Sequence, residues 1–281
     1  MFDPSSFDVA AYLARIGYDG PLTADGQTLA RIARLHPAAI PFENLNVLLG
    51  RPVPLDIASL QQKLVRERRG GWCFEHNVLL GTALAAIGFD VEGLSARVLW
   101  NAPAGVVRPR SHMVLHVNLH DGPRIVDAGF GGLTLTGPLK LESDVEQATP
   151  HEPFRLLAVH DTFVMEARIR DEWKALYQFD LQRQALTDYE VSSWYLTTHP
   201  RSHFTAVLVA ARALADRRYA LSNTELAIHH RDGYTERRAL LSASDLRQVL
   251  QELFGIDVPT GDDVDAALAR LVESAASPAI R

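Results

Sequence analysis

The sequence predicts an α/β multidomain protein of the α+β class, with a helical bundle over residues 1–88, an antiparallel barrel or sandwich over 89–190 and an α/β segment over 191–281. Two observations predict this order. Apolar residues follow the 3.6-residue helical period up to Gly88, alternate as in strands to about residue 190, and return to helical spacing near the C-terminus. A chain of 281 residues is long enough for more than one compact unit.

Four helices are expected within residues 1–88. Their boundaries are Asp8 and Gly17 for the first helix, Pro37 for the end of the second, Asp56 for the start of the third, and Cys73 and Gly88 for the fourth. Aspartate at a helix start accepts hydrogen bonds from free backbone N–H groups, and glycine readily ends a helix. We expect the second helix to end at Pro37, because proline has no N–H to donate and its ring clashes with the preceding turn.

Strand patterns follow the fourth helix. The stretch HMVLHVNL (112–119) alternates strictly, with apolar residues on one face and His112 and His116 on the other, more polar face. Asp121-Gly122 is a hairpin signal that leads into the next strand. Further strand-like runs cover 94–100, 154–160, 163–169 and 173–179. Their spacing is typical of an antiparallel barrel or sandwich.

The last segment combines strands and helices. Residues 219–240 are expected to form strands joined at Ser222-Asn223 and Asp232-Gly233. Two amphipathic helices follow, whose inward-facing residues are Leu246, Val249, Leu250 and Leu253 in the first and Val264, Leu268, Leu271 and Val272 in the second. This order predicts a small α/β unit at the end of the chain.

Composition disfavours several classes of protein. The 28 Lys and Arg residues against 34 Asp and Glu residues give a net charge of −6, which disfavours sequence-independent binding to nucleic acid. A single Cys cannot form an internal disulfide, which fits a reducing compartment. The first residues lack a signal-peptide pattern, and no apolar run reaches the ~18 residues of a membrane span. We therefore expect a cytoplasmic protein, monomeric or homo-oligomeric, that binds neither nucleic acid nor membrane.

The single cysteine, Cys73, lies within RRGGWCFEHN (68–77) at the expected start of the fourth helix. A free thiol of pKa ~8.5 is mostly protonated at neutral pH, so a nucleophilic cysteine needs a cation or a helix N-terminus nearby. Because the amides at a helix start favour negative charge, we expect them to lower the pKa of Cys73 and to supply donors for an oxyanion. Packing alone is the other explanation for a lone thiol.

A base for this thiol must come from elsewhere in the chain. His76 lies on the same helix as Cys73 and is awkwardly placed for proton transfer. His112 and His116 share a strand face, and Asp127 follows among apolar residues, where a carboxylate requires a partner. A two-residue turn between the strands sets Asp127 opposite His116, whereas a longer turn or a bulge changes that register. The residues alone leave both histidines open.

The same strand face carries His112, His116 and His120, which raises the question of a metal site. Four residues of strand cover about 13 Å, too far for two ligands of one zinc ion at ~2 Å each. One of these histidines with Cys73 and Asp127 is a conceivable zinc site, but no Cys pair or His-Glu-x-x-His spacing supports it. We expect no metal.

The motif RGGWCFEHN resembles the Arg-Gly-Gly-x-Cys-x-Glu-x-Asn segment of the arylamine N-acetyltransferases. IPFENLN before it, and RSHM, VDAGFGG and WYLTTHPRSHF after it, are similar to further segments of that family in the same order, with Ala128 where the family has Val. The resemblance implies a catalytic triad of Cys73, His112 and Asp127, with the base directly after Ser111. It also implies a helical bundle, a β-barrel and an α/β lid, in agreement with the periodicities.

The resemblance further implies acetyl transfer from acetyl-CoA, the co-substrate, to arylamines, arylhydrazines or hydrazides. In the implied ping-pong mechanism, Cys73 carries the acetyl group between the two substrates. The candidate CoA-binding residues are Gly129, Phe130, Gly131, Phe204 and His229, with Arg108, Arg110 and His229 as candidates for its phosphates or adenine. The candidate acceptor-binding residues are Phe42, Phe130 and Phe204, and Gly132 is a further candidate for ligand binding. Two structural contacts are also expected, a buried Glu43–Arg69 pair and a hydrogen bond from Asn77 within the triad.

Three other functions are compatible with a lone, well-placed thiol. An amide synthase uses the same triad to close a macrolactam, and it differs by its lack of response to acetyl-CoA. A peptidase or transglutaminase-like cysteine hydrolase shares the Cys-His-Asp arrangement and is recognised by peptidase activity that thiol alkylation abolishes. A non-catalytic binding protein with a buried thiol is recognised by slow alkylation of Cys73.

Overall fold

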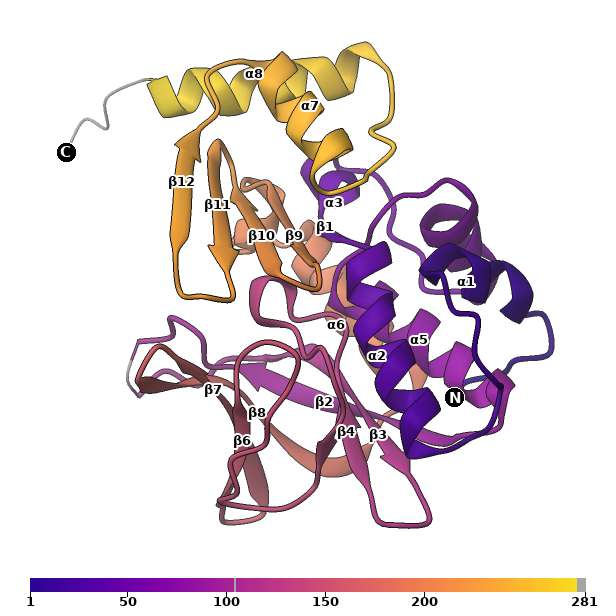
Figure 1. Cartoon of the computed structure of the whole chain (residues 1–281). Helices are drawn as coiled ribbons and strands as arrows, with labels where there is room; N and C mark the ends of the chain where they lie inside the picture. Colours follow the sequence, from indigo (N-terminus) through magenta and orange to yellow (C-terminus); the bar gives the residue numbers. More distant parts are fainter. Residues whose placement is uncertain (104, 277–281) are drawn as a thin grey trace.

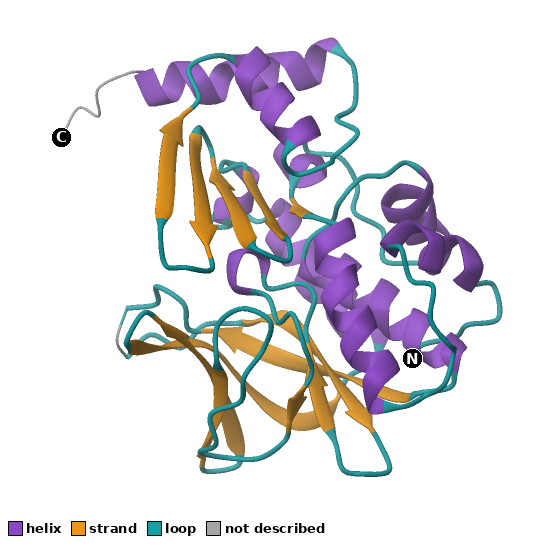
Figure 2. Ribbon diagram, in the orientation of Figure 1, coloured by secondary structure: helices purple, strands orange, loops and turns teal. Residues whose placement is uncertain are grey.

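The computed structural model describes residues 1–103 and 105–276. Helices of the N-terminal third pack beside a barrel-like sheet, and a second sheet with two helices on it lies against both (Figures 1 and 2). The predicted α+β architecture of helical bundle, β-barrel and α/β unit is confirmed.

The N-terminal helices begin and end largely where the sequence predicts. They are α1 (Val9–Ile16), α2 (Gly26–Ala39), α3 (Leu45–Leu48), α4 (Ile57–Leu60), which continues as the π-helical η1 (Gln61–Arg66), and α5 (Cys73–Ile87). The Asp8 carboxylate accepts from the Ala11 amide, and Gly17 ends α1 with φ of 69°. Every residue from Cys73 to Leu84 is buried, which makes α5 the central helix of the bundle.

The expected end of the second helix at Pro37 is wrong, because α2 continues to Ala39. Pro37 lies in the last turn, where its missing N–H removes one hydrogen bond but leaves the next residues free to close the turn. The Ile40 amide still donates to the carbonyl oxygen of His36. A proline so close to a helix end therefore costs less than one in the interior.

Within the described residues, the larger sheet has seven antiparallel strands in the order β5-β4-β3-β2-β8-β7-β6. The strands are β2 (Asp90–Val98), β3 (Arg110–Asn118), β4 (Arg124–Val126), β5 (Leu139–Lys140), β6 (Phe154–Val159), β7 (Thr162–Ile169) and β8 (Glu172–Arg183). Bridges from Ser143 to Leu156 and from Gln147 to Phe154 tie the chain after β5 to β6. These bridges nearly close the sheet on itself, so the barrel alternative is the one that forms (Figure 2).

Strand β3 is buried on both of its faces at residues 112–115. Met113, Leu115 and Val117 pack in the core of the helical region, and Val114 points into the core of the barrel. The face expected to be polar is therefore the inner face of the barrel, and His112 on that face is buried as well. This position between two cores holds β3 rigidly against α5.

The register between β3 and β4 decides where Asp127 lies. His116 pairs with Ile125 and Leu115 with Val126, so Asp127, one residue further, lies level with Val114. The Gly122 amide donates to the Leu119 carbonyl, in a connection longer than a two-residue turn. The register that sets Asp127 opposite His116 is not formed.

The second sheet joins the two ends of the chain. It comprises β1 (Phe42–Glu43), β9 (Val209–Ala213), β10 (Arg217–Ser222), β11 (Glu225–His230) and β12 (Thr235–Ala239), followed by α7 (Ala243–Glu252) and α8 (Asp262–Ala276). Ser222 pairs with Glu225, so the β10–β11 turn is Asn223–Thr224, one residue later than expected. The apolar faces of α7 and α8 pack on this sheet as predicted.

Helix α6 (Leu186–Thr198) has no counterpart among the expected elements. Its buried residues Tyr189, Ser193 and Leu196 face the molecule, while Val191 and Trp194 are exposed, so its apolar residues do not form one helical stripe. The helix packs against β3 and crosses residue 190, and β1 pairs with β9 across the first and third segments. The division at residues 88 and 190 stays a prediction.

Candidate active site

The loop before Cys73 is shaped by two glycines. A Cβ at Gly70 would lie 2.1 Å from the carbonyl oxygen of Pro41, and Gly71 forms a bridge with Phe42. Helix α5 begins directly afterwards, at Cys73, as the sequence predicts. The close approach of the loop to its neighbours requires glycine, and it sets the thiol on the first residue of the central helix.

His112 and Asp127 form a buried hydrogen-bonded pair. His112 Nε2 lies 2.7 Å from Asp127 Oδ2, and both side chains are almost wholly inaccessible to solvent. The other carboxylate oxygen accepts from Asn77 Nδ2 at 2.9 Å and from the Gly129 amide at 2.8 Å. Burial by itself raises the pKa of Asp127, but the His112 charge and these hydrogen bonds outweigh it and hold the pKa below its ordinary value.

Asn77 fixes this carboxylate from a position one helical turn after Cys73. Its amide nitrogen also donates to the Met113 carbonyl at 2.7 Å, and its oxygen accepts from the Ala128 amide at 3.1 Å. One side chain of α5 therefore joins β3 and the loop after β4, and the expected hydrogen bond from Asn77 is present.

Cys73 lies beside the start of β3. Its Sγ is 3.7 Å from the carbonyl oxygen of Ser111, the residue before His112. His116 lies four residues further along the same strand face, where its Nδ1 is 3.8 Å from a carboxylate oxygen of Glu92. The structure thus brings Cys73, His112 and Asp127 together and leaves His116 outside this group.

The ionisation of Cys73 differs from the expectation. Burial, the negative charge of Asp127 and that of Glu75 raise the pKa of the Cys73 thiol, while the backbone amides of Phe74 and Cys73 lower it. The predicted effect of the helix start is present, but burial outweighs it. A thiolate at Cys73 therefore requires a neighbouring base to take its proton.

Two aromatic rings enclose His112. The ring centre of Tyr177, from β8, lies 4.9 Å from that of His112, and Phe130 lies edge-on at 5.2 Å. Burial, with the charge of Asp127, raises the pKa of Tyr177 well above its ordinary value, so its hydroxyl stays protonated. Phe130 is only half-buried, so part of its ring borders solvent next to His112.

Other candidate ligand residues lie around the start of α5. Phe204, in the short helix η3 (His203–Thr205), meets Trp72 edge to face at 5.6 Å. Phe42 stacks on His76 with ring centres 6.3 Å apart. A Cβ on Gly131, whose φ is 77°, would lie 3.7 Å from the Phe42 ring, so this loop and Phe42 are in contact.

Three charged candidates lie apart from the thiol or are already paired. Arg110 forms an ion pair with Asp180 at 2.5 Å, and His229 makes its side-chain hydrogen bond to Thr235 in the second sheet. Arg108 is exposed in the loop before β3. Of the two arginines, Arg110 is in an ion pair, whereas Arg108 forms none with the residues that the structure describes.

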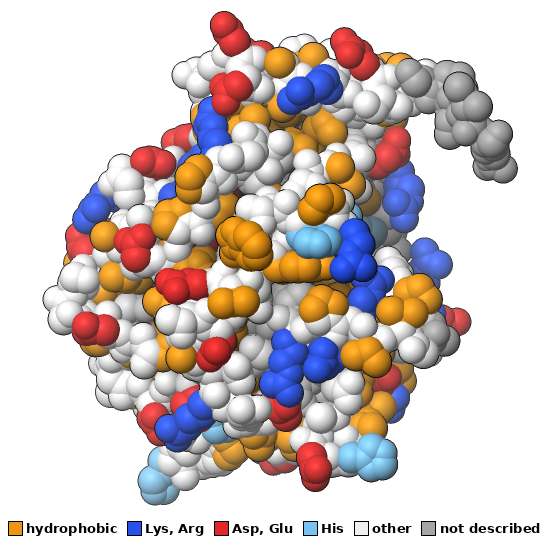
Figure 3. Space-filling model, turned by 180° about the vertical axis from the view of Figure 1, so that it is seen from behind, with side chains coloured by type: hydrophobic (Ala, Val, Ile, Leu, Met, Phe, Trp, Pro, Cys, Tyr) orange, Lys and Arg blue, Asp and Glu red, His pale blue; other side chains and the backbone are white. Residues whose placement is uncertain are grey.

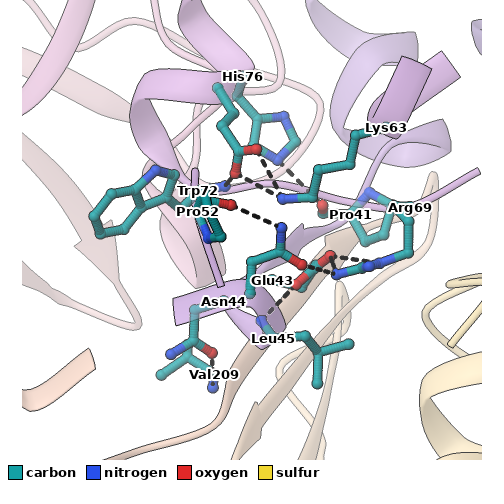
Figure 4. Close-up of polar contacts among 12 residues, drawn as sticks. Pro41, Glu43, Asn44, Leu45, Pro52, Lys63, Arg69, Trp72, His76 and Val209 are labelled. Atoms are coloured by element: carbon teal, nitrogen blue, oxygen red, sulfur yellow. Dashed lines mark hydrogen bonds and ion pairs between the residues drawn. The ribbon is translucent and has the colours of Figure 1, made fainter. Parts of the chain in front are cut away.

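The expected Glu43–Arg69 pair is present and buried (Figure 4). Arg69 donates from Nη2 at 2.6 Å and from Nε at 3.0 Å to one oxygen of Glu43, whose other oxygen accepts from the Leu45 amide. The partly buried Lys63 and the buried Glu75 form a second pair at 2.7 Å. These pairs fix the chain on both sides of the RGGWC loop.

A buried chain of hydrogen bonds, which the sequence did not indicate, excludes His76 as a base. His76 Nε2 donates to the Pro41 carbonyl, and its Nδ1 lies 2.9 Å from His36 Nε2. His36 Nδ1 in turn lies 2.8 Å from the Tyr12 hydroxyl. These residues lie on three different helices, so no local spacing joins them.

Among residues 1–103 and 105–276, no three His, Cys, Asp or Glu side chains are grouped so as to hold a metal ion. None of the helices that the structure describes is both long and apolar enough to cross a membrane.

The fold and this group of side chains define the class as α+β enzymes with a buried Cys-His-Asp arrangement. A sequence profile described as N-acetyltransferase matches residues 25–263. The arylamine N-acetyltransferase of Mycolicibacterium smegmatis is 44% identical over 275 residues, covering 96% of this chain and 100% of that protein. The enzyme of that name from Escherichia coli is 39% identical over 249 residues, covering 88% of each. The chain belongs to the arylamine N-acetyltransferase family, whose members are acyltransferases.

Solved structures agree with this assignment. The arylamine N-acetyltransferase of Mycobacterium marinum superposes with a TM-score of 0.91 at 42% identity, covering 94% of this chain and all of that one. The same enzyme in complex with CoA superposes with a TM-score of 0.90 at 41% identity, covering 94% and 99%. The amide-synthase and hydrolase alternatives are not favoured by these comparisons.

Proposed function

We propose that this chain transfers the acetyl group of acetyl-CoA to arylamines, arylhydrazines or hydrazides through an acetyl-cysteine at Cys73. The observation that carries the proposal is the buried His112–Asp127 pair, whose histidine directly follows Ser111, the residue that contacts the Cys73 thiol. The relatives named above carry the acetyltransferase name, and one is solved with CoA.

In the first half-reaction, His112 takes the proton of the Cys73 thiol. Its Nε2 is held by Asp127, which leaves Nδ1 as the nitrogen for this transfer. The thiolate attacks the thioester carbonyl of acetyl-CoA, and the backbone amides of Cys73 and Phe74 supply donors near the sulfur for the developing oxyanion. The bond from the acetyl carbon to the CoA sulfur then breaks, and CoA leaves with the proton from His112.

In the second half-reaction, the amine nitrogen attacks the carbonyl of acetyl-Cys73. His112 accepts a proton from the nitrogen, the bond from the acetyl carbon to Sγ breaks, and the amide product departs. Asp127 stabilises the charged imidazole in both steps, and Asn77 and Gly129 hold its carboxylate in place. Weakly basic amines suit this step, because their nitrogen is unprotonated near pH 7.

The ligand contacts are proposed on the same basis. Phe130 borders both His112 and solvent, which favours a wall shared by both substrates. Phe204 and Phe42 lie near the start of α5 and suit an aromatic acceptor, and Gly129, Gly131 and His229 stay candidates for CoA. A cytoplasmic location, consistent with a single unpaired thiol, belongs to this proposal.

The test is the intact-protein mass after mixing with acetyl-CoA in the absence of amine. We expect one added acetyl group, mapped to Cys73 and lost when an arylamine such as 4-anisidine is added. The variant Cys73→Ala should gain no mass. An unmodified wild-type protein that releases no CoA with any of a range of amines contradicts the proposal, and longer acyl thioesters are then the donors to test.

A further inference from the structure

Arg218, in β10, is a buried arginine that joins the second sheet to the barrel region. Figure 3 shows Lys and Arg side chains on the surface of one face of the molecule, whereas only 2% of Arg218 is exposed. Its guanidinium donates to the carboxylate of Glu152, which precedes β6, at 2.7 Å from Nη2 and 3.0 Å from Nε. The same Nη2 donates at 3.0 Å to the carbonyl oxygen of Thr134, which follows the short helix η2 (Gly131–Leu133). Arg218 therefore fixes the end of the loop after β4.

The hydroxyl of Thr134 closes this loop on itself. It donates to the backbone carbonyl of Asp127 at 2.8 Å and accepts from the Phe130 amide at 3.3 Å. A hydroxyl can act as donor and acceptor at once, and both bonds lie inside the molecule, since Thr134 is only 3% exposed. Without the hydroxyl, a carbonyl and an amide of the loop would lose this partner.

The two residues that Thr134 joins are the ones that border His112. Asp127 Oδ2 lies 2.7 Å from His112 Nε2, and the ring of Phe130 lies edge-on to that of His112, with ring centres 5.2 Å apart. A displacement of the loop therefore moves the partner of the base and the ring beside it together. Because proton transfer depends steeply on the separation and direction of the groups, a small shift here slows the step in which the thiol loses its proton.

We propose that Thr134 and Arg218 are positioning residues for the reaction at Cys73. Thr134 ties the backbones of Asp127 and Phe130 to each other, and Arg218 ties Thr134 to the second sheet. Both act through the geometry of the base and take no part in making or breaking bonds. The inference rests on the proposed acetyl transfer, and it gives the second sheet a part in setting the rate of that reaction.

The experiment measures the maximal rate of Cys73 acetylation at saturating acetyl-CoA without amine, by rapid mixing, acid quench and intact-protein mass, together with the Tm of each variant. Thr134→Val keeps the shape of the side chain and removes the hydroxyl, whereas Thr134→Ser keeps the hydroxyl. Thr136→Val is the matched control, because Thr136 is 1% exposed and its hydroxyl lies 3.0 Å from His151 Nδ1. The control removes an equally buried hydrogen bond from the same connection, one that involves neither Asp127 nor Phe130.

We expect Thr134→Val to lower the maximal acetylation rate about tenfold or more at a temperature where it is folded, and Thr134→Ser to restore a rate near that of the wild type. Thr136→Val should lower the Tm by several degrees, as Thr134→Val does, and keep the rate of the wild type. Equal rates for Thr134→Val and Thr136→Val overturn the positioning role. A rate for Thr134→Ser as low as that for Thr134→Val overturns it as well.

Arg218→Lys tests the tie from the second sheet and decides the proposal by itself if Thr134→Val does not fold. Lysine keeps a cation opposite Glu152, but a single ammonium group lacks the fork that reaches the carboxylate and the Thr134 carbonyl together. We expect the maximal acetylation rate to fall several-fold, and an unchanged rate overturns the role of Arg218. A wild type that gains no acetyl group at Cys73 overturns the proposed function instead.

Discussion

Gly129 lies so close to Cys73 that a Cβ on it would be 2.6 Å from the Cys73 Cα and 2.7 Å from its carbonyl oxygen. The same glycine donates its amide to Asp127. The loop after β4 therefore rests directly on the start of α5, and this contact sets the carboxylate and the thiol at a fixed separation.

The variant Gly129→Ala should disrupt that contact. Overpacking typically costs about 1–3 kcal/mol, and here the clash is with backbone that cannot rotate away, so we expect a Tm lower by several degrees and acetylation of Cys73 slowed at least tenfold. Thermal melts and the rate of CoA release check this. Gly132→Ala is the matched variant, because a Cβ at Gly132 meets nothing within 4 Å, and its Tm should equal that of the wild type.

Substitution of His112, but not of His116, should slow acetyl transfer. His112→Gln removes the base and the partner of Asp127, and we expect the rate of acetyl transfer to fall by about 10²-fold or more. His116→Gln removes only the contact with Glu92 and should leave the rate near that of the wild type. Stopped-flow release of CoA compares the two variants, and the reverse order of their rates contradicts the proposed role of His112.

Arg69→Met should destabilise the fold strongly. It leaves the carboxylate of Glu43 buried without its cation, which typically costs about 3–5 kcal/mol in the free energy of unfolding. Arg168→Gln breaks the exposed pair with Glu146 and should cost about 1 kcal/mol or less. Urea denaturation of both variants measures the difference. Equal losses for the buried and the exposed pair contradict this reading of Figure 4.

Stability should fall as the pH decreases below about 6.5, the ordinary pKa of histidine. Burial lowers the pKa of His76 to about 4 and holds that of His36 well below its ordinary value, so both stay neutral in the folded protein when they are protonated in the unfolded chain. Stability is therefore full above pH 6.5 and is lost toward pH 4, by about 3 kcal/mol for His76 alone.

Two measurements check this pH dependence. Urea denaturation at pH 7 and at pH 4.5 should give a smaller free energy of unfolding at the lower pH. NMR titration of the native protein should show that His36 and His76 keep their neutral imidazole signals down to pH 5. Protonation of either buried histidine at pH 6 contradicts the expectation.

Local signals predicted most of the secondary structure correctly. Asp8 and Gly17 bound α1, and Cys73 and Gly88 bound α5, because capping and left-handed termination depend on a few neighbouring residues. The end of α2 was misplaced at Pro37 and α6 was missed. Helix α2 continues past Pro37 because a proline in the last turn removes only one hydrogen bond. Helix α6 has no single apolar stripe, so its packing against other elements, which no local pattern contains, decides its formation.

The candidate site likewise depends partly on local sequence signals and partly on contacts between distant segments. The sequence by itself determined the position of Cys73 at a helix start and, through its family motifs, the residues expected to act with it. Tertiary structure alone decided the β3–β4 register that sets Asp127 level with Val114, the burial that raises the pKa of Cys73, and the hydrogen-bonded chain of Tyr12, His36 and His76. Register, burial and convergence depend on contacts between segments distant in the chain, whereas helix caps and turns depend only on neighbours.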